Sequence, residues 1–155
     1  MNQPSNAVRP FDARTRTSFG NWTHHTIRYN DQDTLGHVNN AVYSTFFEAG
    51  RTSFIEPMMR EVGAEAKSLD FVLARVTIDF IAELSYPGAV DIGTHVLRLG
   101  NKSITFGNGI FNEGHDTCVA TCEAVLVFFD LDTRTSVAPP AALRAMIENS
   151  MIEAE

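Results

Sequence analysis

RYNDQDTLGHVNNAVYSTFFEAGR, residues 28–51, is the stretch that decides what this chain is expected to fold into. It places a carboxylate pair, Asp31 and Asp33, followed by a glycine, a histidine and two asparagines, directly before an aromatic-rich helical pattern. A loop carboxylate that leads into a helix lies beside backbone N–H donors that no intrahelical carbonyl uses. Those donors can stabilise a developing oxyanion while the carboxylate attacks the same carbon or activates a water. This order of residues is typical of an acyl-transfer site.

The segment from Asn39 to Glu56 is predicted to be a long helix. Its apolar residues cover a wider face than a surface helix needs, so a sheet is expected to wrap it. These residues are Val42, Tyr43, Phe46, Phe47, Ala49, Phe54 and Ile55. Gly50 costs about 1 kcal/mol relative to alanine inside a helix, so we expect it to mark a close approach of helix and sheet. Asn39 is the expected N-cap, and Pro57 is expected to end or kink the helix.

These residues carry a resemblance to a known family. The pattern is Asp31, Asp33, Gly36-His37-Val38-Asn39-Asn40, Tyr43, Glu48 and Arg51. It resembles the signature of the 4-hydroxybenzoyl-CoA thioesterase family of hot-dog-fold acyl-CoA thioesterases. The resemblance implies an α+β hot-dog fold, with a five-stranded antiparallel sheet wrapped around one long helix and a short C-terminal helix. It also implies a homodimer or homotetramer with each site at a subunit interface.

The resemblance assigns roles within the stretch. It implies that Asp33 is the catalytic carboxylate and that the backbone N–H of Asn40 polarises the thioester carbonyl. Gly36, Asn39 and Tyr43 are expected to contact the substrate. Asp31 is expected to order the loop.

Two questions about the chemistry stay open at this stage. An aspartate carboxylate is ionised at neutral pH, so Asp33 is suited to act as a nucleophile, or as a general base if desolvation assists it. His37 is a candidate catalytic residue that contacts Asp33 or the substrate, and its alternative role is to fix the loop. Glu48 and Arg51 are expected to form an ordinary ion pair three residues apart on the helix. A rival hypothesis makes Glu48 the reactive carboxylate.

The rest of the chain alternates as strands do. We expect strands over residues 23–30, 71–81, 90–99, 103–112 and 117–131, and a short helix over residues 141–149. Tight turns between successive strands imply an antiparallel sheet. Gly107 and Gly109 share one strand face, so something is expected to pack very close there, either the helix or an acyl chain.

Length and composition limit the number of domains and the classes of partner that this chain is expected to have. A chain of 155 residues fits a single domain, predicted over residues 21–155 behind a disordered or loose tail over residues 1–20. A net charge of −7 argues against nucleic acid as a partner, and no apolar run has the length of a membrane span. Cys118 and Cys122 are expected on one strand face about 13 Å apart, too far for a disulfide. Free thiols suit a reducing cytoplasm, which is the expected location.

The expected substrate is an acyl-CoA, with no cofactor and no metal. Arg98, Lys102 and Ser103, around the turn between the third and fourth strands, are candidates to bind its phosphates. Two alternatives remain. One is a thioesterase for acyl groups on acyl carrier protein, a class whose plant members resemble the motif but carry Asn where this chain has Leu35. The other is a non-catalytic acyl-binding protein of the same fold.

Overall fold

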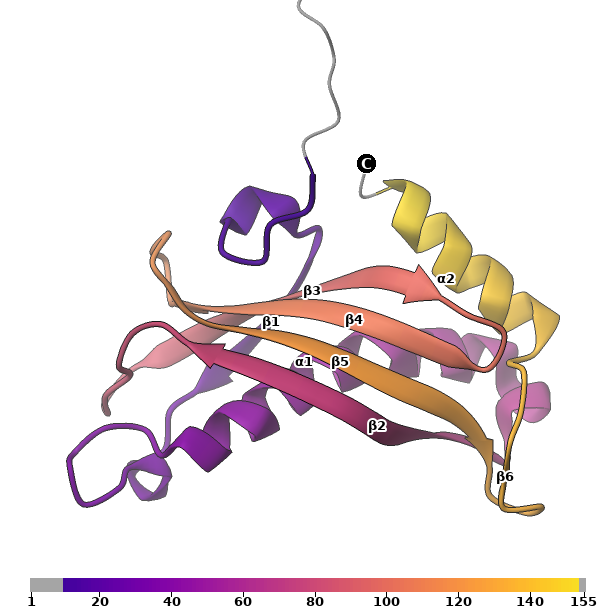
Figure 1. Cartoon of the computed structure of the whole chain (residues 1–155), viewed down its shortest axis with the longest axis horizontal. Coiled ribbons are helices and arrows are strands. Elements are labelled where there is room, and N and C mark those ends of the chain that lie inside the picture. The colour runs from indigo at the N-terminus through magenta and orange to yellow at the C-terminus, as the bar shows by residue number, and fades with distance from the viewer. Residues whose placement is uncertain (1–9, 154–155) are drawn as a thin grey trace, which may run out of the picture.

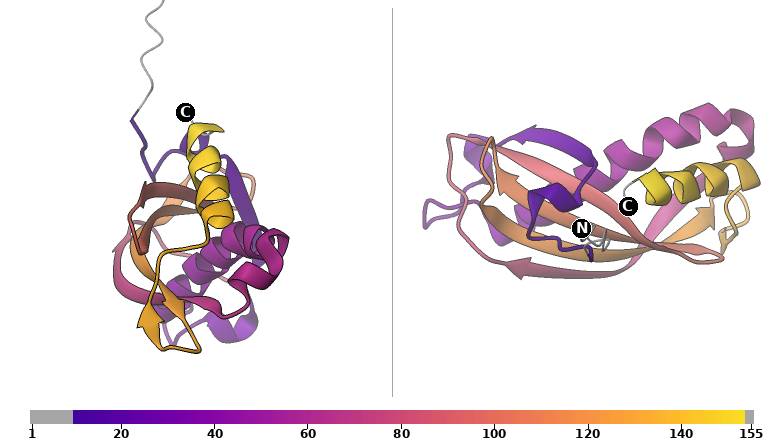
Figure 2. Two further views of the ribbon diagram at one scale, coloured as in Figure 1. Left: turned by 90° about the vertical axis from the view of Figure 1, so that its right-hand side faces the viewer. Right: turned by 90° about the horizontal axis from the view of Figure 1, so that it is seen from above.

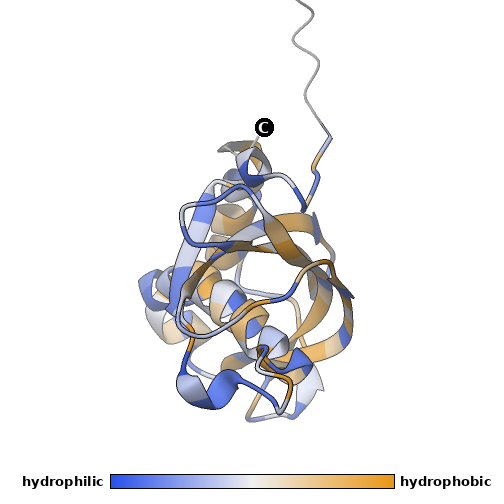
Figure 3. Cartoon of the chain, turned by 90° about the vertical axis from the view of Figure 1, so that its left-hand side faces the viewer, coloured by the Kyte–Doolittle hydropathy of each residue, from blue (hydrophilic) through white to orange (hydrophobic). Residues whose placement is uncertain are grey.

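A long helix, α1 (Asn40–Val62), lies across one face of a curved antiparallel sheet (Figure 1). The structure is a computed structural model that describes residues 10–153. The sheet order is β1-β3-β4-β5-β2, and a two-residue strand, β6, pairs with β5. The strands are β1 (Asn21–Thr26), β2 (Leu69–Phe80), β3 (Ala89–Leu99), β4 (Ser103–Asn112), β5 (Cys118–Asp130) and β6 (Thr135–Ser136). Viewed nearly along the helix, the sheet curves around α1 (Figure 3), which confirms the predicted α+β hot-dog fold.

The start of α1 follows the prediction and its end does not. The Asn39 side chain accepts a hydrogen bond from the backbone N–H of Ala41 at 2.9 Å and so caps the first turn. The helix then continues through Pro57 to Val62 and ends at Gly63, which has φ 67°. Pro57 is on the exposed face of α1, so water can bind the carbonyl that its missing N–H leaves free. The helix does not end at Pro57, so that part of the prediction was wrong.

The aromatic face of α1 is buried against the sheet. Phe46 and Phe47 are almost fully inaccessible and join a cluster that includes Ile92, Ile110 and Ala124 on the strands. A Cβ at Gly50 would come within 2.7 Å of the Ile92 side chain, which confirms the predicted close approach of helix and sheet.

The C-terminal helix, α2 (Ala141–Glu153), closes the other end of the core. Figure 2 shows it beside the C-terminal part of α1, and Leu143 and Ile147 are fully buried there. They pack in a second cluster with Phe54 and Phe106, whose rings meet edge to face. Helix α2 is one turn longer than predicted, because its apolar positions continue to Met151.

Residues 10–20, which we call the N-terminal strap, cross the outer face of the sheet (Figure 2). The sequence predicts a loose tail over residues 1–20, of which residues 1–9 lie outside the described part. Phe11 stacks on the ring of His95, and Phe19 lies edge to face against Phe111. The glycines of the sheet have no side chain and so leave room for the strap. A Cβ at Gly107 would lie 2.8 Å from the Phe11 ring. The strap, rather than α1 or an acyl chain, thus explains the shared face of Gly107 and Gly109.

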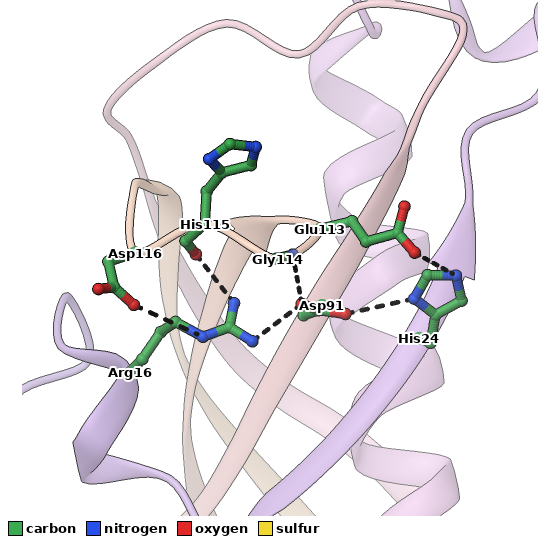
Figure 4. Close-up of polar contacts among 7 residues, drawn as sticks. All are labelled: Arg16, His24, Asp91, Glu113, Gly114, His115 and Asp116. Atoms are coloured by element: carbon green, nitrogen blue, oxygen red, sulfur yellow. Dashed lines mark hydrogen bonds and ion pairs between the residues drawn. The ribbon is translucent and has the colours of Figure 1, made fainter.

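Arg16 fastens the strap to the sheet (Figure 4). Its guanidinium donates to the Asp91 carboxylate at 2.9 Å and to the carbonyl of His115 at 3.0 Å. It also lies 4.4 Å from the centre of the Trp22 ring. Asp91 contacts His24 Nδ1 at 3.2 Å as well, so one carboxylate joins the strap to β1 and β3.

A bulge changes the faces of the two cysteines. In β5, the register shifts opposite Ile110 and Phe111. Cys118 therefore faces the strap, 3.8 Å from the carbonyl of Ala13, whereas Cys122 belongs to the core on the α1 side. The prediction that they share a face was wrong, because one extra residue reverses the alternation. Both are free thiols.

Candidate active site

The loop before α1 is built on a buried carboxylate, Asp31. A short 3-10 turn, Tyr29–Asp31, brings it back to Arg28. Its oxygens accept from the Arg28 backbone N–H at 2.7 Å and from the guanidinium at 2.8 and 3.1 Å. Its own carbonyl accepts from the backbone N–H of Asn39 at 2.8 Å, immediately before the helix. Asp31 therefore orders the loop, as expected, and ties both of its ends together.

Asp33 is at the start of a tight turn inside this loop. Gln32 and Val38 form an antiparallel bridge, and the Asp33 N–H donates to the carbonyl of His37 at 2.8 Å. One carboxylate oxygen, Oδ1, accepts from the backbone N–H of Leu35 at 2.8 Å. This is an Asx turn, which fixes the direction of the side chain. Gly36, with φ 79°, provides the left-handed conformation that the turn requires.

A surface pocket of about 500 Å³ opens beside the Asp33 carboxylate. It is lined by Tyr29, Asn30, Gln32, Asp33, Thr34 and Gly36. All of these residues come from the motif loop, so a single ordered segment carries both the carboxylate and the space next to it. Of the sequence candidates, Asp33 and Gly36 line this pocket. Tyr29, Asn30, Gln32 and Thr34 were not predicted. Gln32 and Thr34 lie between motif residues, and Tyr29 and Asn30 directly precede the first of them.

The start of α1 provides the donors. Asn39 and Asn40 are both exposed at the first turn, where N–H groups have no intrahelical acceptor. The Asn39 side chain accepts a hydrogen bond from the backbone N–H of Ala41, and the Asn39 carbonyl accepts one from the backbone N–H of Val42 at 2.9 Å. The backbone N–H of Asn40 belongs to the same turn and shares the positive end of the helix dipole. Both residues follow the Asp33 turn in the chain by six or seven positions.

His37 is paired with a carboxylate on another segment. Its Nε2 lies 3.1 Å from Glu83, in the stretch that connects β2 to β3. The neighbouring Val38 N–H donates to the carbonyl of Leu84 at 2.8 Å. His37 therefore helps to join the motif loop to residues 83–84.

Tyr43 is a core residue. It is 3% exposed, its ring meets Phe80 edge to face at 5.2 Å, and its hydroxyl donates to the carbonyl of Ala82 at 3.4 Å. Burial raises the pKa of the phenol above its ordinary value. Within a single copy of the chain, the structure places Tyr43 one turn into α1 and away from the pocket beside Asp33.

The structure does not bring the phosphate candidates to this loop. Ile27 N donates to the carbonyl of Gly88 at 2.9 Å, so the loop begins at the Ala89 end of β3. Arg98 is near the opposite end of β3, about 30 Å away along the strand, and Lys102 and Ser103 are in the turn and the first position of β4 that follow it. There Arg144 of α2 donates to the carbonyls of Gly100 and Asn101 at 2.8 and 3.0 Å.

Glu48 and Arg51 do not form the expected ion pair within the described residues. Glu48 is exposed, whereas Arg51 is 6% exposed and lies beside Cys122. Burial raises the pKa of the Cys122 thiol to about 11 and lowers that of Arg51. Arg51, three residues after Glu48, faces the sheet instead of the solvent. The spacing of the two charges in the sequence does not reveal this.

Residues 10–153 contain no cluster of three or more His, Cys, Asp or Glu side chains arranged to hold a metal ion. They also contain no helix with the length and apolar character needed to cross a membrane.

Solved structures with this fold include several thioesterases. The PA5185 protein of Pseudomonas aeruginosa has a TM-score of 0.80 and 25% identity, with 88% of this chain and 94% of that chain covered. A predicted thioesterase from Bacillus stearothermophilus has a TM-score of 0.73 and 26% identity, with coverages of 84% and 95%. A thioesterase from Thermus thermophilus, solved with coenzyme A and zinc, has a TM-score of 0.74 and 25% identity, with coverages of 86% and 96%. No curated protein sequence matches significantly.

The sequence itself matches a family model. The model of the Thioesterase-like superfamily covers residues 27–147, from the end of β1 into α2. The chain therefore belongs to the Thioesterase-like superfamily. The fold, the family and the related structures make it a thioester hydrolase, as the motif predicts.

Proposed function

We propose that the protein is an acyl-CoA thioesterase of the 4-hydroxybenzoyl-CoA thioesterase branch, which hydrolyses an acyl-CoA to a free carboxylic acid and CoA. The observation that carries the proposal is the fixed turn at Asp33. One oxygen of its carboxylate accepts a hydrogen bond from the Leu35 N–H, and the carboxylate borders an open pocket. The N–H donors at the N-terminus of α1 follow a few residues later in the chain. A carboxylate and helix N–H groups on one ordered segment are the two elements that acyl transfer requires.

Asp33 serves this reaction by either of two routes. In the first, its carboxylate attacks the thioester carbon, the C–S bond breaks, and the thiolate leaves with the bonding electrons. Water then hydrolyses the resulting anhydride and restores the carboxylate. In the second route, Asp33 accepts a proton from a water that attacks the same carbon, and the leaving thiolate takes up that proton. The N–H of Asn40 stabilises the oxyanion in both routes. His37, paired with Glu83, acts by holding the loop.

CoA is preferred here over acyl carrier protein as the acyl carrier. A carrier protein is an acidic partner and needs a broad basic docking surface, which a chain of net charge −7 does not favour. The Thermus thermophilus relative was solved with coenzyme A. The test compares kcat/KM for one acyl group on CoA and on the carrier protein at low and moderate salt. A clear preference for the carrier protein would reverse this choice.

We further propose that the active form is a dimer joined through β2. This edge strand exposes Val72, Leu73, Val76 and Phe80 by 42–49%. The other edge, β1, is about half as long and mostly polar. A two-fold axis across β2 runs the partner's strands in the opposite direction, so the end of one copy that carries Arg98 and Lys102 and the motif end of the other lie at the same end of the joined sheet. We propose that those cations serve Asp33 of the other copy in this arrangement.

The proposed reaction is tested by Asp33→Asn. The amide oxygen of asparagine can still accept the Leu35 N–H, so the turn is kept while the ionised carboxylate is lost. We expect kcat to fall by at least about a hundredfold with an unchanged unfolding transition. Glu48→Gln is the matched control, because it removes an exposed carboxylate from α1. A larger loss in Glu48→Gln than in Asp33→Asn would move the reaction onto the helix.

A further inference from the structure

Strand β2 is an edge of the sheet (Figure 1). Within residues 10–153, it pairs with β5 on one side and with no strand on the other. A bulge at Ala74 divides it, because the register with β5 shifts between Leu73 and Arg75. Residues 75–80, after the bulge, pair with β5 without interruption. A bulge disturbs the pairing of an edge, so this regular part is the segment of β2 that is suited to add a further strand.

The side chains of this regular part alternate between the two faces of the sheet. Ile78 packs against the core cluster on the α1 side, so Arg75, Thr77 and Asp79 point to the opposite face. They border one groove there together with Phe11 of the strap. The outer face of the edge therefore presents a cation, a hydroxyl and a carboxylate at equal spacing.

Neither of the two charges has a partner in a single copy of the chain. Within residues 10–153, the exposed side chains of Arg75 and Asp79 make no hydrogen bond and no ion pair. They are four residues apart, about 13 Å along the strand, so they do not reach each other. Across an antiparallel pair of strands, directly opposed unlike charges stabilise the pairing and like charges destabilise it. The two free charges therefore make this edge selective for the strand that pairs with it.

Two-fold symmetry limits the ways in which two copies of this edge can pair. A residue on the axis faces its own counterpart, and the residues two before and two after it face each other. An axis at Arg75 or Asp79 places two like charges opposite each other. An axis at Val76 or Ile78 leaves both charges opposite uncharged residues. An axis at Thr77 places each arginine opposite an aspartate and the two threonines opposite each other.

The axis at Thr77 also covers the exposed apolar side chains at both ends of the edge. Phe80 and Ile81 are exposed at the motif end, and Val72 and Leu73 are exposed before the bulge. Antiparallel pairing about Thr77 brings the first two of one copy beside the last two of the other. Residues 83–84, which contact the motif loop, follow directly after Ile81.

We infer that two copies of the chain pair through β2 with the two-fold axis at Thr77, so that Arg75 of each copy forms an ion pair with the partner's Asp79. The inference rests on the dimer proposed above and identifies the residues that align its two strands. The other side chains of residues 75–80 are uncharged, so the two ion pairs select one alignment for edges that are otherwise able to slip. The same alignment places the partner's Val72 and Leu73 next to the segment that holds the motif loop.

Single cysteines on the edge measure the register. A residue on the axis has its Cα about 4.5–5.5 Å from that of its counterpart, which a disulfide spans, whereas at every other position the two are at least about 7 Å apart. After oxidation with copper phenanthroline, Thr77→Cys should give at least about fivefold more covalent dimer on a non-reducing gel than any other variant. The unchanged protein, with Cys118 and Cys122, is the control and should give none. The variants for comparison are Val72→Cys, Arg75→Cys, Val76→Cys, Ile78→Cys and Asp79→Cys. A larger yield at one of these positions, or no covalent dimer from any variant, would overturn the inference.

Charge exchange tests the ion pairs themselves. Arg75→Asp and Asp79→Arg should each raise the Kd of the dimer, measured by sedimentation equilibrium, by at least about tenfold, because each places like charges opposite each other twice. The first variant makes the chain more negative and the second less so, so a loss in both is not an effect of net charge. The double variant Arg75→Asp/Asp79→Arg restores the pairs in exchanged order and should return Kd to within about threefold of the unchanged protein. Single variants without effect, or a double variant as weak as the singles, would reject the ion pairs.

These measurements use no thioester. A register that fails the cysteine and charge tests leaves the proposed hydrolysis standing, and a protein that hydrolyses no acyl-CoA can still pass both tests. The two failures are therefore distinguishable.

Discussion

Arg28 and Asp31 form a closed clamp in which one buried carboxylate holds both the backbone and the guanidinium of a residue three positions earlier. Burial by itself raises the pKa of Asp31, but the hydrogen bonds and the charge of Arg28 outweigh it and hold the pKa below its ordinary value. The carboxyl is therefore favoured in its ionised form in the folded protein. Because the clamp positions the Asp33 turn, it links folding to the site.

This linkage predicts an acid-sensitive loop. A carboxyl whose pKa is lowered by folding contributes stability above its unfolded pKa of about 4, and that contribution is lost as pH falls through the folded value. Asp31→Asn should lower the free energy of unfolding at pH 7 by about 1–3 kcal/mol. Below pH 3 the difference from the unchanged protein should shrink. Urea titrations at both pH values measure it, and a difference that does not depend on pH would contradict the clamp.

The glycines under the strap give a prediction about packing. A Cβ at Gly109 would meet the carbonyl oxygen of Ala13, which is backbone and has little freedom to move, and would lie 2.9 Å from the Phe111 ring. We expect Gly109→Ala to cost about 1–3 kcal/mol of unfolding free energy. Gly20→Ala, with nothing within 4 Å of its Cβ, is the matched control and should be neutral or slightly stabilising. Equal thermal midpoints for the two variants would mean that the strap does not pack as described.

The hydrogen bonds that hold Arg16 against the sheet predict where a protease will cut. Asp91 accepts from Arg16, His24 and the backbone N–H of Gly114, so its loss should free the strap from the sheet. Asp91→Asn should speed trypsin cleavage after Arg14, measured by mass spectrometry, by about tenfold or more. Asp116→Asn is the control, because that side chain is 97% exposed and 3.9 Å from Arg16. Equal cleavage rates in the two variants would show that Asp91 does not hold the strap.

Local signals in the sequence predicted most of the strands and the start of the long helix, whereas the hot-dog fold itself was implied by the resemblance of the motif to a known family. Strand β4 was placed at residues 103–112, as observed, because a Gly-Asn-Lys turn marks its start and the side chains alternate. The start of α1 followed from Asn39, whose capping role needs no tertiary contact. The end of α1 was missed because the cost of Pro57 depends on whether its turn faces water, which is a tertiary property.

The site was predictable in part, for a related reason. The Asp33 turn is local, with its partners at Leu35 and His37, so the motif was sufficient to find it. Its distance from Lys102 depends on strand order and register, which no motif encodes. The strap escaped prediction because residues 10–20 are mostly polar, and the sheet glycines that receive Phe11 lie far away in the sequence.

The edge strand β2 gives the last prediction, which concerns assembly. Its exposed apolar residues are expected to pair with those of a second copy, because an unpaired edge with such side chains invites strand addition. Val76→Lys places a charge in the middle of that edge and should convert a dimer to a monomer in sedimentation at micromolar concentration. Thr26→Lys, exposed on the β1 edge, is the matched control and should leave the dimer intact. If Arg98 and Lys102 of a second copy complete the site, KM for acyl-CoA should rise with dissociation while the fold is retained. A monomeric Val76→Lys variant with full activity would show that each copy is complete alone.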